Sequence, residues 1–254
     1  MTTRVPPPAS PAPPQGYLAH AAYALYGVLA WILFTVVALT TLGLVLLLPG
    51  MERRRRATRG AARTFLRLAG MPLEVRGLEH LPAGQCVVVA NHASYLDGVV
   101  MKAALPPRFA YVVKREMASF PLAGLMLKRI GTEFVERFDR HKGASDARRV
   151  LRSASGGQPL VFFPEGTFSN ERGLLKFHAG AFIAAARAGC PVVPAVILGS
   201  RDILPGTRAL PRPGRVMVEF LAPIVATSAN AAPELRARAR QRILARLGEP
   251  DLAA

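Results

Sequence analysis

Residues 28–48 form a stretch of 21 residues without a charged side chain. A helix needs about 20 apolar residues to cross the hydrocarbon core of a bilayer, so this stretch predicts a membrane helix rather than a buried core helix. Extended back to Tyr17 and on to Gly50 it would measure about 51 Å as a helix, more than one upright span and less than two. We therefore predict a tilted single helix over residues 17–50, with a shallow hairpin that breaks near Gly27 as the alternative.

The segments on either side of this stretch differ in charge. Residues 1–16 are rich in proline and are expected to be a disordered tail. Residues 51–70 carry seven arginines, against one arginine before the apolar stretch. The positive-inside rule then predicts that the part of the chain after residue 50 lies in the cytoplasm. The formal net charge of +17 favours anionic partners, and next to a membrane helix the basic segment is expected to bind anionic lipid rather than nucleic acid.

Residues 71–254 alternate between two patterns. Short apolar runs predict strands, and longer runs with helical periodicity lie between them. We expect an α/β fold with a central mixed, largely parallel sheet flanked by helices. The predicted strands are 73–75, 86–90, 109–113, 133–135, 160–163, 192–198 and 216–220, and the predicted helices are 96–105, 118–130, 145–155, 180–188 and 233–247.

Polar side chains directly follow two of the predicted buried strands. Asn91, His92 and Asp97 come after the run that ends at Ala90, and the residues 163–167 (Phe-Pro-Glu-Gly-Thr) follow another strand. The ends of neighbouring parallel strands form one mouth of a sheet, where α/β proteins keep their chemistry. A neutral histidine accepts a proton near pH 7, and a carboxylate on its other ring nitrogen fixes the tautomer. We predict that His92 is a general base and that Asp97, in the first turn of the next helix, folds back to orient it; its alternative role is to stabilise the helix dipole.

Four sequence blocks in this order resemble the glycerolipid acyltransferase family, whose best-known members are the lysophosphatidic acid acyltransferases. The blocks are Asn91-His92 with Asp97, residues 131–137 (Gly-Thr-Glu-Phe-Val-Glu-Arg), residues 163–167, and residues 193–197 (Val-Pro-Ala-Val-Ile). The resemblance covers residues 71–225, so that residues 71–254 are expected to be the catalytic domain. It implies transfer of a fatty acyl group from an acyl carrier protein or coenzyme A thioester to the hydroxyl of a lysophospholipid, giving phosphatidic acid from 1-acyl-sn-glycerol-3-phosphate.

The resemblance also implies which residues surround the acceptor. Arg137 would bind a phosphate; its alternative is a surface ion pair with Glu136 or Asp139. For Glu165, a structural role in the loop is as consistent as a substrate contact. The full expected set of substrate-binding residues is Asn91, Arg137, Glu165, Gly166, Thr167 and Lys176. No cofactor beyond the thioester co-substrate is expected, and the five histidines lack the paired spacing of a metal site.

Two positions depart from the family pattern. Phe168 follows the Glu-Gly-Thr where many lysophosphatidate enzymes carry arginine, and His178 stands in a later position where a lysine is common. Arg172, Lys176 and Lys114 are the cations that would compensate. If these cations do not compensate, the acceptor is a lipid other than lysophosphatidate, and a lyso-aminolipid is the natural variant. An acyl-thioester hydrolase that uses the same base on water remains the third alternative, because the sequence does not show whether water is excluded.

Cys86 and Cys190 both lie in apolar runs and are expected to be small buried side chains in a reducing compartment. The Arg- and Ala-rich composition and the short length favour a bacterial chain. These features together predict a protein of the bacterial inner membrane with its catalytic domain on the cytoplasmic face.

Overall fold

The computed structural model describes residues 16–136, 140–225, 228 and 230–253. The sequence predicts that residues 1–16 are disordered, and of these residues the structure describes only Gly16. The strands are β1 (Leu73–Arg76), β2 (Val87–Ala90), β3 (Ala110–Lys114), β4 (Glu133–Val135), β5 (Leu160–Phe162), β6 (Val192–Leu198) and β7 (Val216–Phe220). The α-helices are α1 (Tyr17–Leu47), α2 (Met51–Leu68), α3 (Asp97–Ala104), α4 (Pro121–Arg129), α5 (Arg140–Ser155), α6 (Gly180–Arg187), α7 (Ser200–Ile203) and α8 (Ala232–Leu247).

These elements confirm the predicted α/β architecture. The strands form one seven-stranded sheet in the order β1-β7-β6-β2-β5-β3-β4. All neighbouring strands run parallel except β6 and β7, so the sheet is mixed and largely parallel. Because β2 and β5 are neighbours and run parallel, the two polar loops that follow them emerge at the same edge of the sheet, as the sequence predicted.

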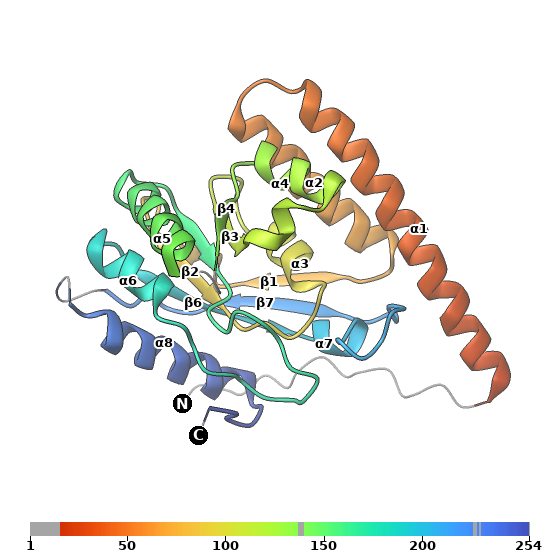
Figure 1. Cartoon of the computed structure of the whole chain (residues 1–254). Helices are drawn as coiled ribbons and strands as arrows, with labels where there is room; N and C mark the ends of the chain where they lie inside the picture. Colours follow the sequence, from red (N-terminus) through yellow and green to blue (C-terminus); the bar gives the residue numbers. More distant parts are fainter. Residues whose placement is uncertain (1–15, 137–139, 226–227, 229, 254) are drawn as a thin grey trace.

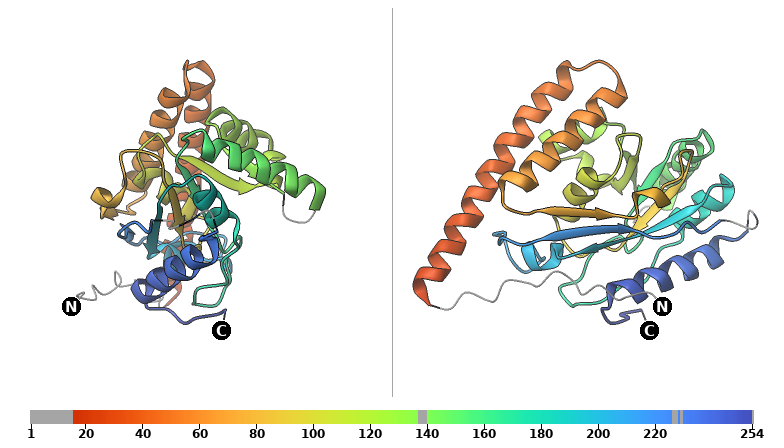
Figure 2. Two further views of the ribbon diagram at one scale, coloured as in Figure 1. Left: turned by 90° about the vertical axis from the view of Figure 1, so that its left-hand side faces the viewer. Right: turned by 180° about the vertical axis from the view of Figure 1, so that it is seen from behind.

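Helices cover both faces of the sheet (Figures 1 and 2). Side chains alternate between the faces along each strand, so Val88 and Ala90 join one core cluster while Val87 and Val89 join the other. The first cluster includes side chains of α2 and α3, and the second includes α5, α6 and α8. The last helix packs on the sheet through the face that its periodicity predicted, namely Leu235, Ala239, Ile243 and Leu247.

The helix α1 is long and apolar enough to cross a membrane. It is one continuous helix of 31 residues without a break near Gly27, which agrees with the predicted single helix and contradicts the alternative of a shallow hairpin. Gly27 instead allows close contact with the domain, because a Cβ atom at this position would lie 2.7 Å from the Cβ of Leu210. The chain turns only after Leu47, and α2 then folds back beside α1 (Figure 1).

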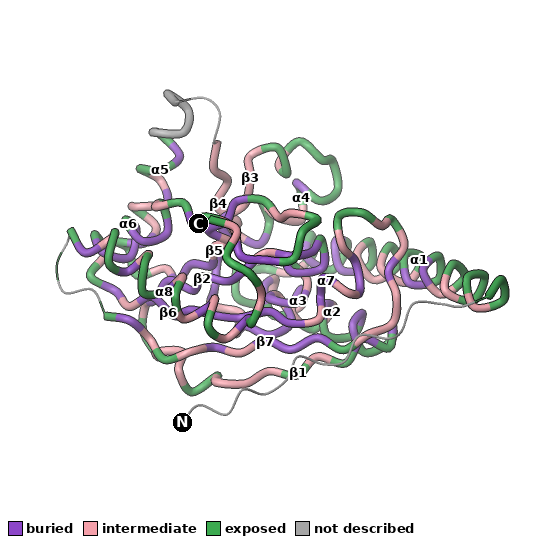
Figure 3. The backbone as a smooth tube through the Cα atoms, turned by 90° about the horizontal axis from the view of Figure 1, so that it is seen from below, coloured by how far each residue is buried: buried purple, intermediate pink, exposed green. Residues whose placement is uncertain are grey.

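Three contacts dock α1 on the rest of the protein. The Tyr26 hydroxyl donates to the carbonyl of Ala69 at 2.7 Å, and the Trp31 indole donates to the carbonyl of Ala209 at 2.8 Å. The Phe34 ring meets the Phe65 ring edge to face at 5.3 Å. The opposite side of α1 remains exposed along its length (Figure 3) and carries the apolar residues Leu25, Leu29, Ile32, Val36 and Leu39.

The basic segment 51–70 is more than a charged run at the membrane surface. It forms the helix α2, which the sequence analysis did not predict, and several of its arginines bind inward. Arg63 donates to the carbonyl of Ala103 at 2.8 Å and Arg59 to that of Ala104 at 3.5 Å, so both cap the C-terminus of α3. Arg55 is only 5% exposed. For these three arginines, a role limited to lipid binding is a wrong expectation.

Candidate active site

His92 lies in the turn between β2 and α3, and Asp97 is the first residue of α3. The chain folds back so that Nδ1 of His92 is 2.8 Å from Oδ2 of Asp97. This is the geometry expected from a spacing of five residues with the histidine before the helix. With its Nδ1–H donated to the carboxylate, the imidazole leaves Nε2 as the proton acceptor.

Asp97 is fixed by its surroundings. It is fully buried, and its Oδ2 also accepts hydrogen bonds from the backbone N–H groups of Ala93 at 2.6 Å and Ser94 at 2.9 Å. Three donors on one oxygen hold the carboxylate in a single orientation at the N-terminus of α3. An ionised Asp97 stabilises the imidazolium that forms when His92 takes a proton.

Glu165 supports the same turn from the neighbouring strand. Its Oε1 accepts the backbone N–H of His92 at 2.6 Å, and its Oε2 accepts that of Leu175 at 2.8 Å. The side chain is 3% exposed, and burial raises its pKa to about 7. Of the two roles left open by the sequence, the structure favours the structural one, because both oxygens are occupied by backbone donors. A direct contact between Glu165 and the substrate stays a prediction.

Asn91 also has a structural role. It is 2% exposed, its Nδ2 donates to the carbonyl of Ile197 at 3.0 Å, and its Oδ1 accepts the backbone N–H of Ile197 at 2.7 Å. These bonds tie the end of β2 to β6, which contains the fourth block of the family resemblance. Both groups of the Asn91 amide are thus engaged by the backbone of Ile197, and its contact with the substrate stays a prediction.

The other residues that were predicted to bind the acceptor substrate lie in different surroundings. Arg137 lies outside the described residues. Gly166, with a φ of +75°, forms the turn after β5, and its N–H donates to the carbonyl of Phe163. Thr167 and Lys176 are exposed. Arg172 is exposed and pairs with Asp202 and, at 3.8 Å, with Glu249; its role in compensating for the arginine missing at position 168 stays a prediction.

Aromatic rings enclose His92, a feature that the sequence analysis did not identify. The Phe163 ring stacks on the imidazole at 4.5 Å, and the Phe168 ring meets it edge-on at 4.8 Å. Tyr95 packs against Phe168 at 4.8 Å. The sequence contained one indication of these rings, because Phe168 directly follows Glu-Gly-Thr where the family pattern has an arginine. These rings give the base an apolar surrounding.

An apolar cavity of about 550 Å³ begins beside this aromatic group, since Tyr95 and Phe163 line it. It lies among α1, α2, α3 and α4, and its size is within the range of pockets that bind small molecules.

The two cysteines are separate from the site. Both are buried and free, as predicted, and burial raises the pKa of Cys86 to about 12 and that of Cys190 to about 11.

The fold and the site together define a class of protein. It is an α/β protein with a histidine–carboxylate pair at the end of a parallel strand and an apolar cavity beside that pair. A pair of this kind has the geometry of a general base and its orienting carboxylate, and the cavity is of a size that holds small apolar ligands.

Comparison with known proteins gives the family. Residues 72–198 match the acyltransferase family, and the chain belongs to it. The chain is 32% identical over 160 residues to the chloroplastic 1-acyl-sn-glycerol-3-phosphate acyltransferase BAT2 of Brassica napus, with 62% of this chain and 46% of that protein covered. It is 34% identical over 145 residues to the lyso-ornithine lipid O-acyltransferase of Pseudomonas aeruginosa, with 56% and 54% covered. The chain therefore spans about half the length of the curated relatives it matches.

A solved structure shares the fold. The crystal structure of the 1-acyl-sn-glycerophosphate acyltransferase PlsC from Thermotoga maritima superposes with a TM-score of 0.72 at 23% identity, covering 88% of this chain and 95% of that one. The fold class and the family that the sequence blocks implied are thus both confirmed.

Proposed function

We propose that the protein is an O-acyltransferase that moves a fatty acyl group from a thioester to the free hydroxyl of a lysolipid, with His92 as the general base. The observation that carries this proposal is the 2.8 Å contact between His92 Nδ1 and the buried Asp97. Family membership and the lysolipid acyltransferases among the relatives support the reaction type.

The reaction needs one proton acceptor that later becomes a donor. His92 Nε2 takes the proton of the lysolipid hydroxyl while its oxygen attacks the thioester carbonyl. The tetrahedral intermediate collapses, the carbon–sulfur bond breaks, and the imidazolium of His92 returns the proton to the leaving thiolate. The products are an ester and a free thiol. Throughout these steps Asp97 holds the ring and balances its charge.

The aromatic surroundings favour transfer over hydrolysis. Phe163 and Phe168 both contact the imidazole, and the cavity that starts beside them is apolar. An acyl chain in this cavity would displace water from the neighbourhood of the base. This arrangement supports an alcohol acceptor over water and makes the thioester hydrolase the less favoured alternative.

The helix α1 supports a position at a membrane. Its outer face is apolar and exposed, whereas its inner face packs on the domain. We propose that the outer face contacts lipid at the bacterial inner membrane, with the domain on the cytoplasmic side, where thioester donors are available. The high positive charge supports an anionic lipid surface and an acyl carrier protein or coenzyme A thioester as partners.

Two acceptors are consistent with the site. Lysophosphatidate, giving phosphatidic acid, is the first, and Arg137, Thr167 and Lys176 are the residues proposed to surround it. A lyso-aminolipid is the second, and one observation favours it. Phe168 packs an uncharged ring against His92 where a phosphate-binding arginine is common in the family, and one relative is a lyso-ornithine lipid O-acyltransferase.

The test uses the purified full-length protein with palmitoyl-coenzyme A or palmitoyl acyl carrier protein, and either lysophosphatidate or lyso-ornithine lipid. Release of free thiol and formation of diacyl product are measured together. We expect His92→Ala to lower the rate by about 10²–10⁴-fold, the usual contribution of a general base. His20→Ala, which removes an exposed histidine at the start of α1, is the control and should keep full activity. A folded His92→Ala variant with normal activity would refute the mechanism, and thiol release without diacyl product would identify a hydrolase.

A further inference from the structure

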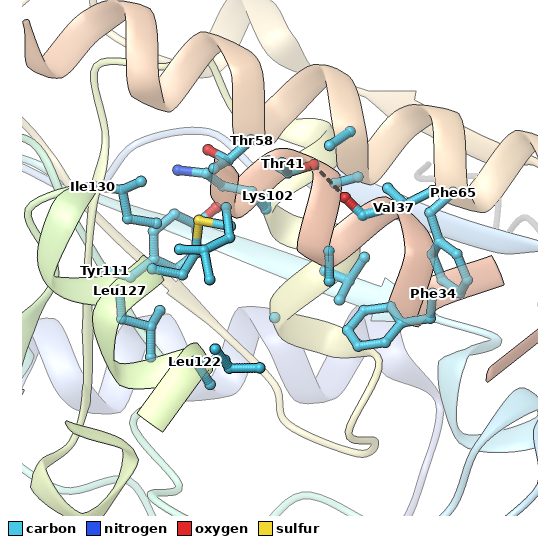
Figure 4. A pocket seen from close by; sticks show the side chains of 18 of the residues that line it. Phe34, Val37, Thr41, Thr58, Phe65, Lys102, Tyr111, Leu122, Leu127 and Ile130 are labelled. Carbon is cyan, nitrogen blue, oxygen red and sulfur yellow. Dashed lines mark hydrogen bonds between the residues drawn. The ribbon is translucent and has the colours of Figure 1, made fainter. Parts of the chain in front are cut away.

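One end of the apolar cavity is polar (Figure 4). Most of its wall is hydrocarbon, supplied by residues such as Phe34, Val37, Phe65, Val99, Leu122 and Leu127. Figure 4 shows Phe34 and Phe65 at one end, and Thr58, Lys102 and Tyr111 gathered at the other. A lysine in such a wall is unexpected, because a charged ammonium loses its hydration there unless a partner replaces it.

Two of the three polar groups at this end, Lys102 and Tyr111, lack a side-chain hydrogen-bond partner among the described residues, whereas the Thr58 hydroxyl donates to the carbonyl of Arg55 at 3.0 Å. The Nζ atom of Lys102 lies 5.0 Å from the ring centroid of Tyr111, and within the described part of the chain it forms no hydrogen bond or ion pair beside this cation–π contact. Tyr111 is 8% exposed, and its hydroxyl oxygen has no hydrogen-bond partner among the described residues. An unpaired buried hydroxyl is unfavourable, so a ligand that accepts its hydrogen bond would stabilise this end of the cavity.

The charges around Lys102 are all positive. Arg55 and Arg59 of α2 lie close enough to influence the ionisation of Tyr111. Arg55 donates to the carbonyl oxygens of Ile130 and Arg108, both at 2.9 Å, and Arg59 donates to that of Ala104. Within residues 16–136, 140–225, 228 and 230–253, no carboxylate pairs with any of these three cations.

The positive charges at this end of the cavity are therefore not balanced by a negative charge of any described residue. Burial and the charge of Arg55 lower the pKa of Lys102 to about 7. The cavity residues contributed by α1 and α4 are uncharged, so nothing on those sides offsets the positive field. A buried positive cluster of this kind attracts a negative group, and an ion pair would restore the ordinary ionisation of the lysine.

We propose that this end of the cavity binds the carboxylate of a long-chain aliphatic ligand, whose chain lies along the apolar wall. The ammonium of Lys102 and the hydroxyl of Tyr111 would both donate to the carboxylate, which accepts hydrogen bonds at both oxygens. The same chemistry has two sources. One is a free fatty acid, and the other is an acyl donor with a carboxylate at the far end of its chain. The second source rests on the proposed acyl transfer, whereas the first does not.

The binding experiment compares laurate with dodecanol, which share a chain length and differ in charge. Both are titrated into the full-length protein in nonionic detergent and followed by calorimetry. We expect saturable laurate binding at least about 10-fold tighter than dodecanol binding, since a hydrogen bond to a charged group contributes about 1.5–3 kcal/mol. Lys102→Met should weaken laurate binding at least 10-fold and leave dodecanol unchanged. Tyr111→Phe, which removes only the hydroxyl, should weaken laurate binding less.

The control is Lys128→Met, which removes an exposed lysine of α4 that does not line the cavity. It should bind laurate like the original protein. Equal affinity for laurate and dodecanol, or normal laurate binding by Lys102→Met, would overturn the proposal.

A second measurement separates the two sources. Slowing of acyl transfer by free palmitate, lost in Lys102→Met, supports a fatty acid as the ligand. Faster turnover of an ω-carboxyacyl thioester than of palmitoyl thioester, also lost in Lys102→Met, supports an acyl donor. Because laurate binding is measured without turnover, it tests the site even if the protein transfers no acyl group.

Discussion

The two ends of helix α3 carry two opposite kinds of polar site. At its start, Asp97 receives three hydrogen bonds on one oxygen, and one of them orients His92. Near its end, Lys102 and Tyr111 face the cavity without a hydrogen bond to any described residue. The two sites share a helix and an apolar cavity, but only the first has its polar groups organised by the protein itself.

This difference separates preorganisation from ligand dependence. His92 is aimed by the fold, so the site needs only a hydroxyl and an acyl group to react. The Lys102 site has donors and charge but lacks an acceptor, which a ligand must supply. Removing a group from the first site should therefore cost activity, whereas removing a group from the second should cost binding and increase the stability of the empty protein.

The largest expected effect is at the first site. Asp97→Asn should lower kcat by about 10²–10⁴-fold, because a neutral amide neither fixes the tautomer of His92 nor stabilises its imidazolium. Thiol release under saturating substrate measures this loss. Asp251→Asn, which removes the carboxylate paired with Arg240, is the control and should be nearly silent. If Asp97→Asn keeps its rate while folded, the two ends of α3 do not differ in the way described.

The first site could be predicted from the sequence because its information is local. His92 and Asp97 are five residues apart, and each polar block directly follows an apolar strand run, so adjacency in a parallel sheet brings the loops together. What the sequence could not give was the direction of Glu165. Its carboxylate accepts the backbone N–H of His92, and only the packing of β5 against β2 determines that contact.

The second site could not be predicted because it is assembled from distant segments. Arg55 comes from α2, Lys102 from α3 and Tyr111 from β3, and no spacing rule connects them. In the sequence, Arg55 is one of four consecutive arginines, which indicate a charged surface. Its burial depends on α2 folding back beside α1, and nothing in the run of charges encodes that contact.

An effect of intermediate size is expected at Lys102. Its lowered pKa means that the folded chain binds this proton less tightly than the unfolded chain does. The corresponding stability is therefore present above pH 10.5 and is lost as the pH falls through about 7. Without a ligand, Lys102→Met should raise the free energy of unfolding at pH 6 by roughly 1–3 kcal/mol, and the gain should shrink at pH 9.

Denaturant unfolding of the two proteins at pH 6 and pH 9 measures this gain. Lys128→Met, the exposed control, should show no such dependence on pH. A Lys102→Met variant that is less stable than the original protein at pH 6 would mean that the ammonium already has a partner, and the contrast between the two ends of α3 would fail.

The smallest effect is expected at Glu165, which belongs to the organised site but also carries a shifted pKa. Burial raises this pKa from 4.5 to about 7, so between these values the folded chain holds a proton that the unfolded chain has released. The stability that this group contributes is therefore fully present below pH 4.5 and is lost as the pH rises through about 7. The free energy of unfolding thus falls with rising pH for Glu165, whereas it rises with pH for Lys102, and the two changes occur in separate pH ranges. The two backbone donors, from His92 and Leu175, oppose the effect of burial, so the net shift of Glu165 is smaller than the shift of Lys102 from 10.5 to about 7.

Glu165→Gln should remove this slope, because an amide does not titrate. Unfolding midpoints at pH 5 and pH 8 should therefore differ less in the variant than in the original protein, and Glu171→Gln, an exposed neighbour, should leave the difference unchanged. Glu165→Gln should also slow acyl transfer, since the amide nitrogen of Gln would face one of two backbone N–H donors and loosen the turn that holds His92. A loss of rate together with a flattened pH response would link the two effects to one carboxyl group. A flattened response with an unchanged rate would instead mean that Asp97 alone is sufficient to position the base.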